Sequence, residues 1–206
     1  MTIFFTSMSR LFATHPVKDT DAERQGLWGE LFLMNQINGF RFFASFWHPE
    51  VRRIFDFSFL NKHIEVKTTL NTERVHHFSH RQLYGQKDEE IVILSIMLIS
   101  SEYGLSLKEL IDKGRIALSG SPNYLKLEQA IIHADMVDTS IEGPKYNSDQ
   151  ALRNMKWYRS IDVPRFNEPE PIGVSETRYK VTLENAKNLD PKELENWLAK
   201  WQETNN

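Results

Sequence analysis

The chain has 206 residues, 40% of them hydrophobic, which is enough for one well-packed domain. Its net charge of −3 differs from the positive balance of proteins that coat nucleic acid non-specifically, and its lack of cysteine excludes disulfides, thiolate zinc sites and cysteine nucleophiles. Neither an apolar run of about 18 residues nor a signal-peptide pattern is visible, so we expect a cytoplasmic protein that does not span a membrane.

The N-terminal region combines an apolar segment with a predicted helix. Three phenylalanines in the first twenty residues are too apolar for a free tail, and we expect them to pack on a core: Phe4, Phe5 and Phe12. A helix-capping pattern at 19–21 then precedes apolar residues spaced i, i+4 and i+7, namely Leu27, Leu31 and Met34. This spacing predicts a helix that ends near residues 38–39.

Three strands are predicted next, at 41–47, 53–60 and 63–69, and the short turn at 61–62 predicts that the last two pair antiparallel. Ser79 and Gln82 form a capping-box pattern that opens a short helix. The apolar run 91–100 is typical of a central strand covered on both faces.

The second half is predicted to contain helices at 105–113 and 124–134, strands at 157–163 and 178–183, and a last amphipathic helix. Pro191 is expected at the first position of that helix, with Asp190 as its cap. The order of elements predicts an α/β or α+β sandwich.

The strand at 63–69 carries the candidate chemistry. Side chains alternate along a strand, so Glu65 and Lys67 should share one face. Asp56, on the preceding strand, interrupts an aromatic run, where a carboxylate is costly unless it is satisfied. Two carboxylates that meet there would suit Mg²⁺, and a nearby lysine can stabilise charge in phosphodiester hydrolysis. The alternative is a solvated strand face with a weak ion pair between Glu65 and Lys67.

Glu30 is a further candidate because it lies in an otherwise apolar helix segment. The adjacent Gly29 permits close approach of backbone or ligand. The alternative is a glutamate on the exposed edge of the helix, paired with Arg24 or Lys18.

The histidines at 76, 77 and 80 leave three interpretations open. His76 and His80 could bind zinc, although no cysteine is present to complete such a site. His77 and His80 could instead line a cleft with Arg74 and Arg81 and contact phosphates, or the segment could be a solvated loop. A later basic stretch, interleaved with aromatic residues, could be a nucleic-acid face or an ordinary strand: Lys145, Arg153, Lys156, Arg159 and Arg165.

The order of Glu30 on a helix, Asp56 on a strand and Glu65-x-Lys67 on the next resembles the PD-(D/E)XK nuclease superfamily. The stretches 64–69 and 74–83 are similar to a bacterial PD-(D/E)XK family found with phage-defence and restriction–modification genes. The resemblance implies one restriction-endonuclease-like domain over 1–206, with an αβββαβ core at about 20–100 and a C-terminal elaboration at about 101–206. This fold is α/β, with a mixed central sheet flanked by helices and additional C-terminal strands and a helix.

Position by position, the resemblance implies that Asp56 and Glu65 bind Mg²⁺, which Mn²⁺ can replace, and that Lys67 is the catalytic lysine. It implies an accessory carboxylate at Glu30 and a polar active-site residue at Gln82. The residue before Asp56 is phenylalanine, where the superfamily motif has proline.

These patterns predict a metal-dependent DNA endonuclease of the restriction type, acting in a restriction–modification or phage-defence system. DNA is the expected partner, and a second copy of the chain and methyltransferase or ATPase subunits are candidates. One alternative is a catalytically silent nuclease-like scaffold that binds DNA or a partner protein. Another is an unrelated α/β interaction protein in which Glu65 and Lys67 are solvated.

Overall fold

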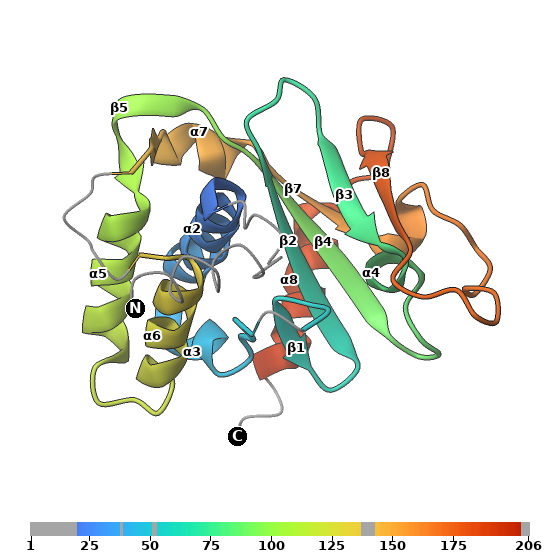
Figure 1. Cartoon of the computed structure of the whole chain (residues 1–206), viewed down its shortest axis with the longest axis horizontal. Helices are drawn as coiled ribbons and strands as arrows, with labels where there is room; N and C mark the ends of the chain where they lie inside the picture. Colours follow the sequence, from blue (N-terminus) through green and yellow to red (C-terminus); the bar gives the residue numbers. More distant parts are fainter. Residues whose placement is uncertain (1–19, 38, 51–52, 137–142, 203–206) are drawn as a thin grey trace, which may run out of the picture.

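The computed structural model describes residues 20–37, 39–50, 53–136 and 143–202 (Figure 1). The predicted packing of Phe4, Phe5 and Phe12 lies outside these residues. The first part of the chain contains helices α2 (Thr20–Gln36) and α3 (Gly39–Ala44), strands β1 (Phe57–Phe59), β2 (Lys62–Thr69) and β3 (Val75–Ser79), helix α4 (His80–Tyr84) and strand β4 (Glu90–Met97).

The second part contains strand β5 (Ser100–Ser106), helices α5 (Leu107–Leu118) and α6 (Tyr124–His133), strand β6 (Lys145–Tyr146), helix α7 (Ser148–Arg153) and strand β7 (Met155–Arg159). A 3-10 turn (Ser160–Asp162), strand β8 (Arg178–Thr182) and helix α8 (Pro191–Gln202) follow. None of the described helices is both long and apolar enough to cross a membrane.

The central sheet is mixed and has the strand order β1-β2-β4-β7. β2 and β4 run parallel, whereas β1 and β7 pair antiparallel with them at the two edges. β3 pairs with β8, and β5 with β6, in two separate two-stranded ladders. The mixed sheet flanked by helices confirms the predicted fold class, and β4 is the central strand that its apolar sequence predicted.

The two faces of the sheet bury different cores. Ile64, Val66 and Leu94 face the larger core, which α2, α3, α5, α6 and α8 complete. Ile93 and Tyr158 face a smaller core with Phe78 of β3 and Val181 of β8. Figure 1 shows α5 and α6 on one side of the sheet and the β3–β8 pair with α4 on the other.

The prediction of a strand at 41–47 was wrong, because residues 39–44 form helix α3. The buried residues Phe40, Phe43 and Ala44 have helical spacing and pack into the larger core, so burial on one helix face overrides the β propensity of the aromatic side chains. The third strand of the αβββαβ order is instead β3, in a segment where no strand was predicted.

Other elements begin or end a few residues from their predicted boundaries. The hairpin of β1 and β2 is confirmed, but β1 begins at Phe57, and Asp56 lies in a bend just before it. The strand predicted at 157–163 is β7, which ends at Arg159 before the 3-10 turn. β5, β6 and α7 were not predicted. The division into a core at about 20–100 and an elaboration at about 101–206 stays a prediction.

Candidate functional site

The candidate site centres on the second half of β2, whose outer edge has no partner in β1. β1 is only three residues long, and its pairing with β2 ends where Phe57 lies opposite Ile64. At the next edge position, the Asp56 carboxylate takes the role of a strand partner, because its Oδ2 accepts a hydrogen bond from the Val66 N–H at 2.7 Å. The predicted closeness of Asp56 to the second half of β2 is therefore present.

Glu65 and Lys67 lie on the face of β2 that is turned away from the larger core, since their neighbours Ile64 and Val66 face that core. Glu65 is only 3% exposed. Its Oε1 lies 2.6 Å from Lys67 Nζ and accepts a hydrogen bond of 2.7 Å from Gln82 Nε2. Its Oε2 is buried and has no hydrogen-bond partner. Glu65 is thus not the solvated residue of the alternative interpretation.

Glu30 reaches the same edge from α2. A Cβ at Gly29 would lie 2.4 Å from Thr68 Cγ2, so only glycine allows α2 to pack this closely on β2. The Glu30 carboxylate accepts a 2.6 Å hydrogen bond from the indole N–H of Trp47. Of its two alternative partners, Arg24 pairs with Asp21 and Asp135 instead, and Lys18 lies outside the described residues. The close approach predicted from Gly29 is therefore observed.

The three carboxylates share one electrostatic environment. Burial, opposed by the Trp47 hydrogen bond and reinforced by the charge of Glu65, raises the pKa of Glu30 to about 7. Burial and the charges of Glu65 and Glu30 raise the pKa of Asp56 well above its usual value. Burial also raises the pKa of Glu65, although Lys67 and Gln82 oppose this change. A cation between these groups would relieve their repulsion.

Gln82 is positioned by the short helix α4. The predicted capping box is present: the Ser79 side chain accepts from the Gln82 N–H, and Gln82 Oε1 accepts from the Ser79 N–H at 3.0 Å. The Gln82 amide also donates to the Ile54 carbonyl at 2.9 Å, in addition to its bond to Glu65. Gln82 therefore connects the segment before Asp56 with the motif strand.

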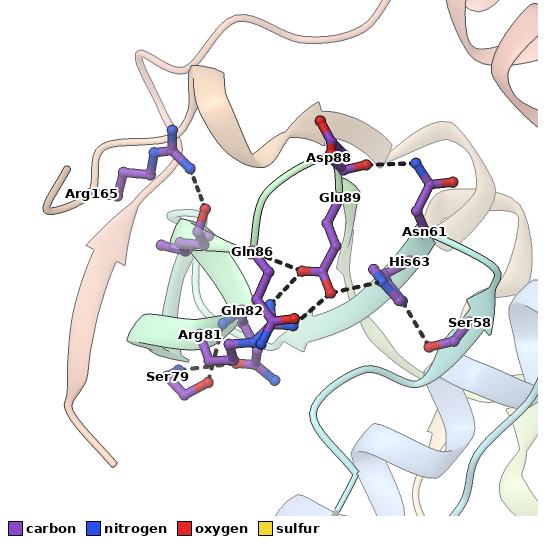
Figure 2. A network of polar contacts seen from close by, with 11 residues as sticks. Ser58, Asn61, His63, Ser79, Arg81, Gln82, Gln86, Asp88, Glu89 and Arg165 are labelled. Atoms are coloured by element: carbon purple, nitrogen blue, oxygen red, sulfur yellow. Dashed lines mark hydrogen bonds and ion pairs between the residues drawn. The ribbon is translucent and has the colours of Figure 1, made fainter. Parts of the chain in front are cut away.

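A polar network anchors α4 to the sheet (Figure 2). Arg81 makes two hydrogen bonds of 2.6 Å to Glu89, which also accepts from the Gln86 N–H. His63 of β2 lies 3.5 Å from the same carboxylate and bonds Ser58 through Nδ1. Sequence reasoning missed Glu89, whose only signal is an acidic residue just before an apolar strand.

The predicted nucleic-acid contacts are divided between the surface and the interior. Arg74 is 3% exposed, and its guanidinium donates to the backbone carbonyls of Ser95 and Asn154. His80 is 5% exposed, and Arg81 is held by Glu89, whereas His77 is exposed. We therefore leave Arg74 and His80 out of any proposed nucleic-acid surface.

The zinc interpretation finds no support in the described residues, where no group of three or more histidine, aspartate or glutamate side chains could hold a metal ion. His76 is buried against Ser95 Oγ at 2.8 Å. The later basic stretch behaves as an ordinary strand at β7, because Trp157 and Tyr158 are buried and Arg159 pairs with Glu193.

Two cavities open on the candidate site. A pocket of about 300 Å³ is lined by Glu30 and Asp56, among others, and a groove of about 910 Å³ by Lys67 and Gln82. Arg53 lines both. The site is thus accessible from two sides.

The mixed sheet, the helix that carries Glu30 and the Asp56/Glu65/Lys67 cluster at the edge of β2 define a protein of the PD-(D/E)XK type, with a nuclease-like fold. Residues 9–184 match a family model described as "Putative PD-(D/E)XK family member, (DUF4420)", and the chain belongs to that family. Comparisons with curated proteins and with solved structures give no match.

Asp56 and Glu65 are the two carboxylates at the edge of β2 that would hold a divalent metal ion, and among the described residues they belong to no group of three or more side chains that could hold one. Proteins of the PD-(D/E)XK type typically use one, and hard cations take carboxylate oxygens. The unpaired, buried Oε2 of Glu65 and the raised pKa values of its neighbours are the features that a bound cation would satisfy. Because Mg²⁺ keeps several waters, two carboxylate ligands are sufficient to hold it.

Proposed function

We propose that the protein is a Mg²⁺-dependent endonuclease that hydrolyses phosphodiester bonds in DNA, with Asp56 and Glu65 as metal ligands and Mn²⁺ as a possible substitute. The observation that carries this proposal is the buried Glu65 carboxylate, which has one oxygen held by Lys67 and Gln82 and the other without a partner. A buried, unpaired carboxylate oxygen is costly, and a ligated cation offsets that cost.

Each side chain of the cluster has a distinct role in the proposed reaction. Asp56 and Glu65 would hold the divalent ion, which would lower the pKa of a bound water and neutralise charge on the phosphate. Lys67, whose Nζ also lies 5.2 Å from the centre of the Phe78 ring, is held where it can donate to a phosphate oxygen as negative charge develops. Gln82 orients Glu65, and Glu30 adds a third carboxylate that is fixed by Trp47.

The test is cleavage of supercoiled and linear duplex DNA with Mg²⁺ or Mn²⁺, alongside calorimetric titration of the metal. Lys67→Ala should bind metal but lose about 10²–10³ in cleavage rate, the usual effect of removing a charge-stabilising donor. Asp56→Asn should lose metal affinity and cleavage while keeping an acceptor for the Val66 N–H.

Thermal denaturation of both variants and an EDTA blank serve as controls. Cleavage that persists in both variants would overturn the site assignment. A wild-type protein that binds DNA and cleaves none would favour the silent scaffold instead. The direct ion pair between Lys67 and Glu65 supports this second candidate, because it already balances the two charges.

We further propose that the endonuclease acts in the cytoplasm as part of a restriction–modification or phage-defence system. The similarity of 64–69 and 74–83 to proteins of such loci supports this context, with methyltransferase or ATPase subunits as partners. A homodimer belongs to the same proposal, and light scattering during size-exclusion chromatography tests it. A monomer at concentrations that support cleavage would contradict it.

A further inference from the structure

A ribbon of two strands from distant parts of the chain lies beside the candidate site. β3 pairs antiparallel with β8, and His77 lies opposite Lys180 and Ser79 opposite Arg178. Phe78, between His77 and Ser79, is buried in the smaller core, and its partner Tyr179, between Arg178 and Lys180, packs against that core. The ribbon is therefore fixed to the sheet by one face, and its other face is directed outward (Figure 1).

The outward face of this ribbon is basic. His77, Arg178 and Lys180 are exposed. Within the part of the chain that the structure describes, neither Arg178 nor Lys180 is paired with an acidic side chain. Because the two cations are separated by one residue on a strand, their Cα atoms are roughly 7 Å apart. They can therefore contact neighbouring phosphates of one DNA strand.

The ribbon also forms a wall of the groove that leads to the motif lysine. His77, Ser79 and Arg178 line the groove of about 910 Å³ together with Lys67 and Gln82. Two acidic residues, Glu170 and Glu176, line it as well, and Glu170 accepts a hydrogen bond from the Thr177 N–H. Arg178 thus adds a cation of the ribbon to the groove that Lys67 lines, and Lys180 lies one residue further along the same strand face.

We propose that the outward face of the β3–β8 ribbon binds the phosphate backbone of duplex DNA and leads it to the carboxylate site. This inference rests on the proposed function, which makes DNA the substrate. A chain with a net charge of −3 has no overall electrostatic attraction for DNA, so binding requires a local concentration of unpaired cations. Sequence reasoning missed Arg178 and Lys180 because they lie about 100 residues after the motif strand.

The test measures binding of a fluorescent DNA duplex by anisotropy between 50 and 200 mM salt, with Ca²⁺ in place of Mg²⁺. The variant Arg178→Ala/Lys180→Ala should bind at least about tenfold more weakly. The slope of log K against log salt should become shallower by about 2, because two phosphate contacts are lost. The control Lys108→Ala/Lys113→Ala removes the same charge from α5 on the other side of the sheet and should change binding less than about twofold.

The outcomes separate this inference from the proposed function. A ribbon variant that binds the duplex as the wild type does, or a wild-type protein that binds no duplex, overturns the inference. Ribbon-dependent binding without cleavage by the wild type with Mg²⁺ or Mn²⁺ leaves the inference standing and overturns the nuclease proposal. Thermal denaturation verifies that both double variants are folded.

Discussion

At the scale of single residues, burial determines how charged groups behave in this protein. Glu65 is 3% exposed, and Lys67 and Gln82 offset only part of the cost of burying its charge. His76, two residues before Phe78, is also buried, but it avoids the cost by staying neutral against Ser95 Oγ. The two residues show the two ways in which a buried ionisable side chain is accommodated.

His76 should make the protein sensitive to acid. Burial, together with the charges of Lys67, Arg74 and His77, lowers the pKa of His76 to about 3. Below pH 6.5 the unfolded chain therefore binds a proton that the folded chain excludes, so stability is lost as the pH falls from about 6.5 towards 3. The contribution of His76 to this loss is at most about 1.4 kcal/mol per pH unit.

Urea denaturation at several pH values between 7.5 and 4.5 measures this effect. His76→Gln keeps an amide that can bond Ser95 but cannot titrate, so its stability should fall less steeply with acid than that of the wild type. The matched control is His77→Gln, at the exposed neighbouring position. Parallel curves for the wild type and His76→Gln would contradict the prediction.

Arg74 illustrates what a sequence does not reveal about a single residue. Its place among histidines and arginines after the motif strand suggested a phosphate contact. The structure instead directs its guanidinium to the carbonyls of Ser95 and Asn154. Those acceptors come from strand β4 and the end of α7, and no local pattern near residue 74 indicates their approach. The positions of Glu65 and Lys67 on one strand face and of Gln82 in a capping box were predictable from local patterns, whereas Asp56 was expected on a strand and lies in a bend.

At the scale of elements, the contact of α2 with β2 brings a helix carboxylate to the motif strand. The absence of a side chain at Gly29 leaves room for Thr68 Cγ2, and the Gln25 side-chain amide donates to Thr68 Oγ1 at 3.0 Å. One turn of α2 is therefore in direct contact with the free half of β2. The position of Glu30 depends on this contact.

Gly29→Ala should destabilise the protein by about 1–3 kcal/mol, the usual cost of overpacking, although alanine favours a helix over glycine by about 1 kcal/mol. The added Cβ would clash with Thr68 Cγ2 and displace Glu30 from the site. The metal affinity of this variant, measured by calorimetry, should also be lower than that of the wild type.

The double variant Gly29→Ala/Thr68→Ser tests whether the clash with Thr68 causes the loss of stability. Serine removes Cγ2 but retains the hydroxyl that bonds Gln25, so most of the lost stability should return. Some strain should remain, because the new Cβ also lies 3.3 Å from Val66 Cγ1. A single Gly29→Ala variant as stable as the wild type would refute the close-packing argument.

The errors in predicting elements have definite physical origins. The aromatic segment at 41–47 has strong β propensity, and only its packing at residues 40, 43 and 44 selects the helix. β3 contains two histidines, and its ladder partner β8 begins at Arg178, so a local window gives no sign of a strand. Elements with local signals were predicted, such as the β1–β2 hairpin, α4 and α8.

At the scale of the whole molecule, the larger core extends beyond the part that the family model describes. The family match ends at residue 184, whereas α8 spans Pro191–Gln202. Trp197 and Trp201 of this helix are nevertheless buried in the larger core, and the Trp197 N–H donates to Glu90 at the start of β4. The end of the described chain therefore covers the sheet that carries the site.

Trp201→Ala should lower the free energy of unfolding by about 3–5 kcal/mol, as expected for a fully buried aromatic side chain. The Trp201 ring packs edge to face on Phe46 and contacts Phe43 and Phe59, and its side chain has no exposure. Chemical denaturation measures the loss.

Trp201→Phe is the control for this prediction. It keeps a ring in the cluster and removes an indole N–H that is buried without a hydrogen-bond partner. Its cost should therefore be well below that of alanine. Equal stability of the wild type and the alanine variant would mean that α8 contributes nothing to the core.

The bond from the Val66 N–H to Asp56 at the open edge of β2 also bears on how this family can evolve. An aspartate that protects a strand edge and also serves the proposed reaction is under two selection pressures. A descendant without the proposed DNA cleavage would be free to lose Lys67, but it would still need an acceptor at position 56 to keep the edge paired. Aspartate or asparagine at this position in a relative would therefore indicate a preserved sheet edge, and only the lysine would report on the chemistry.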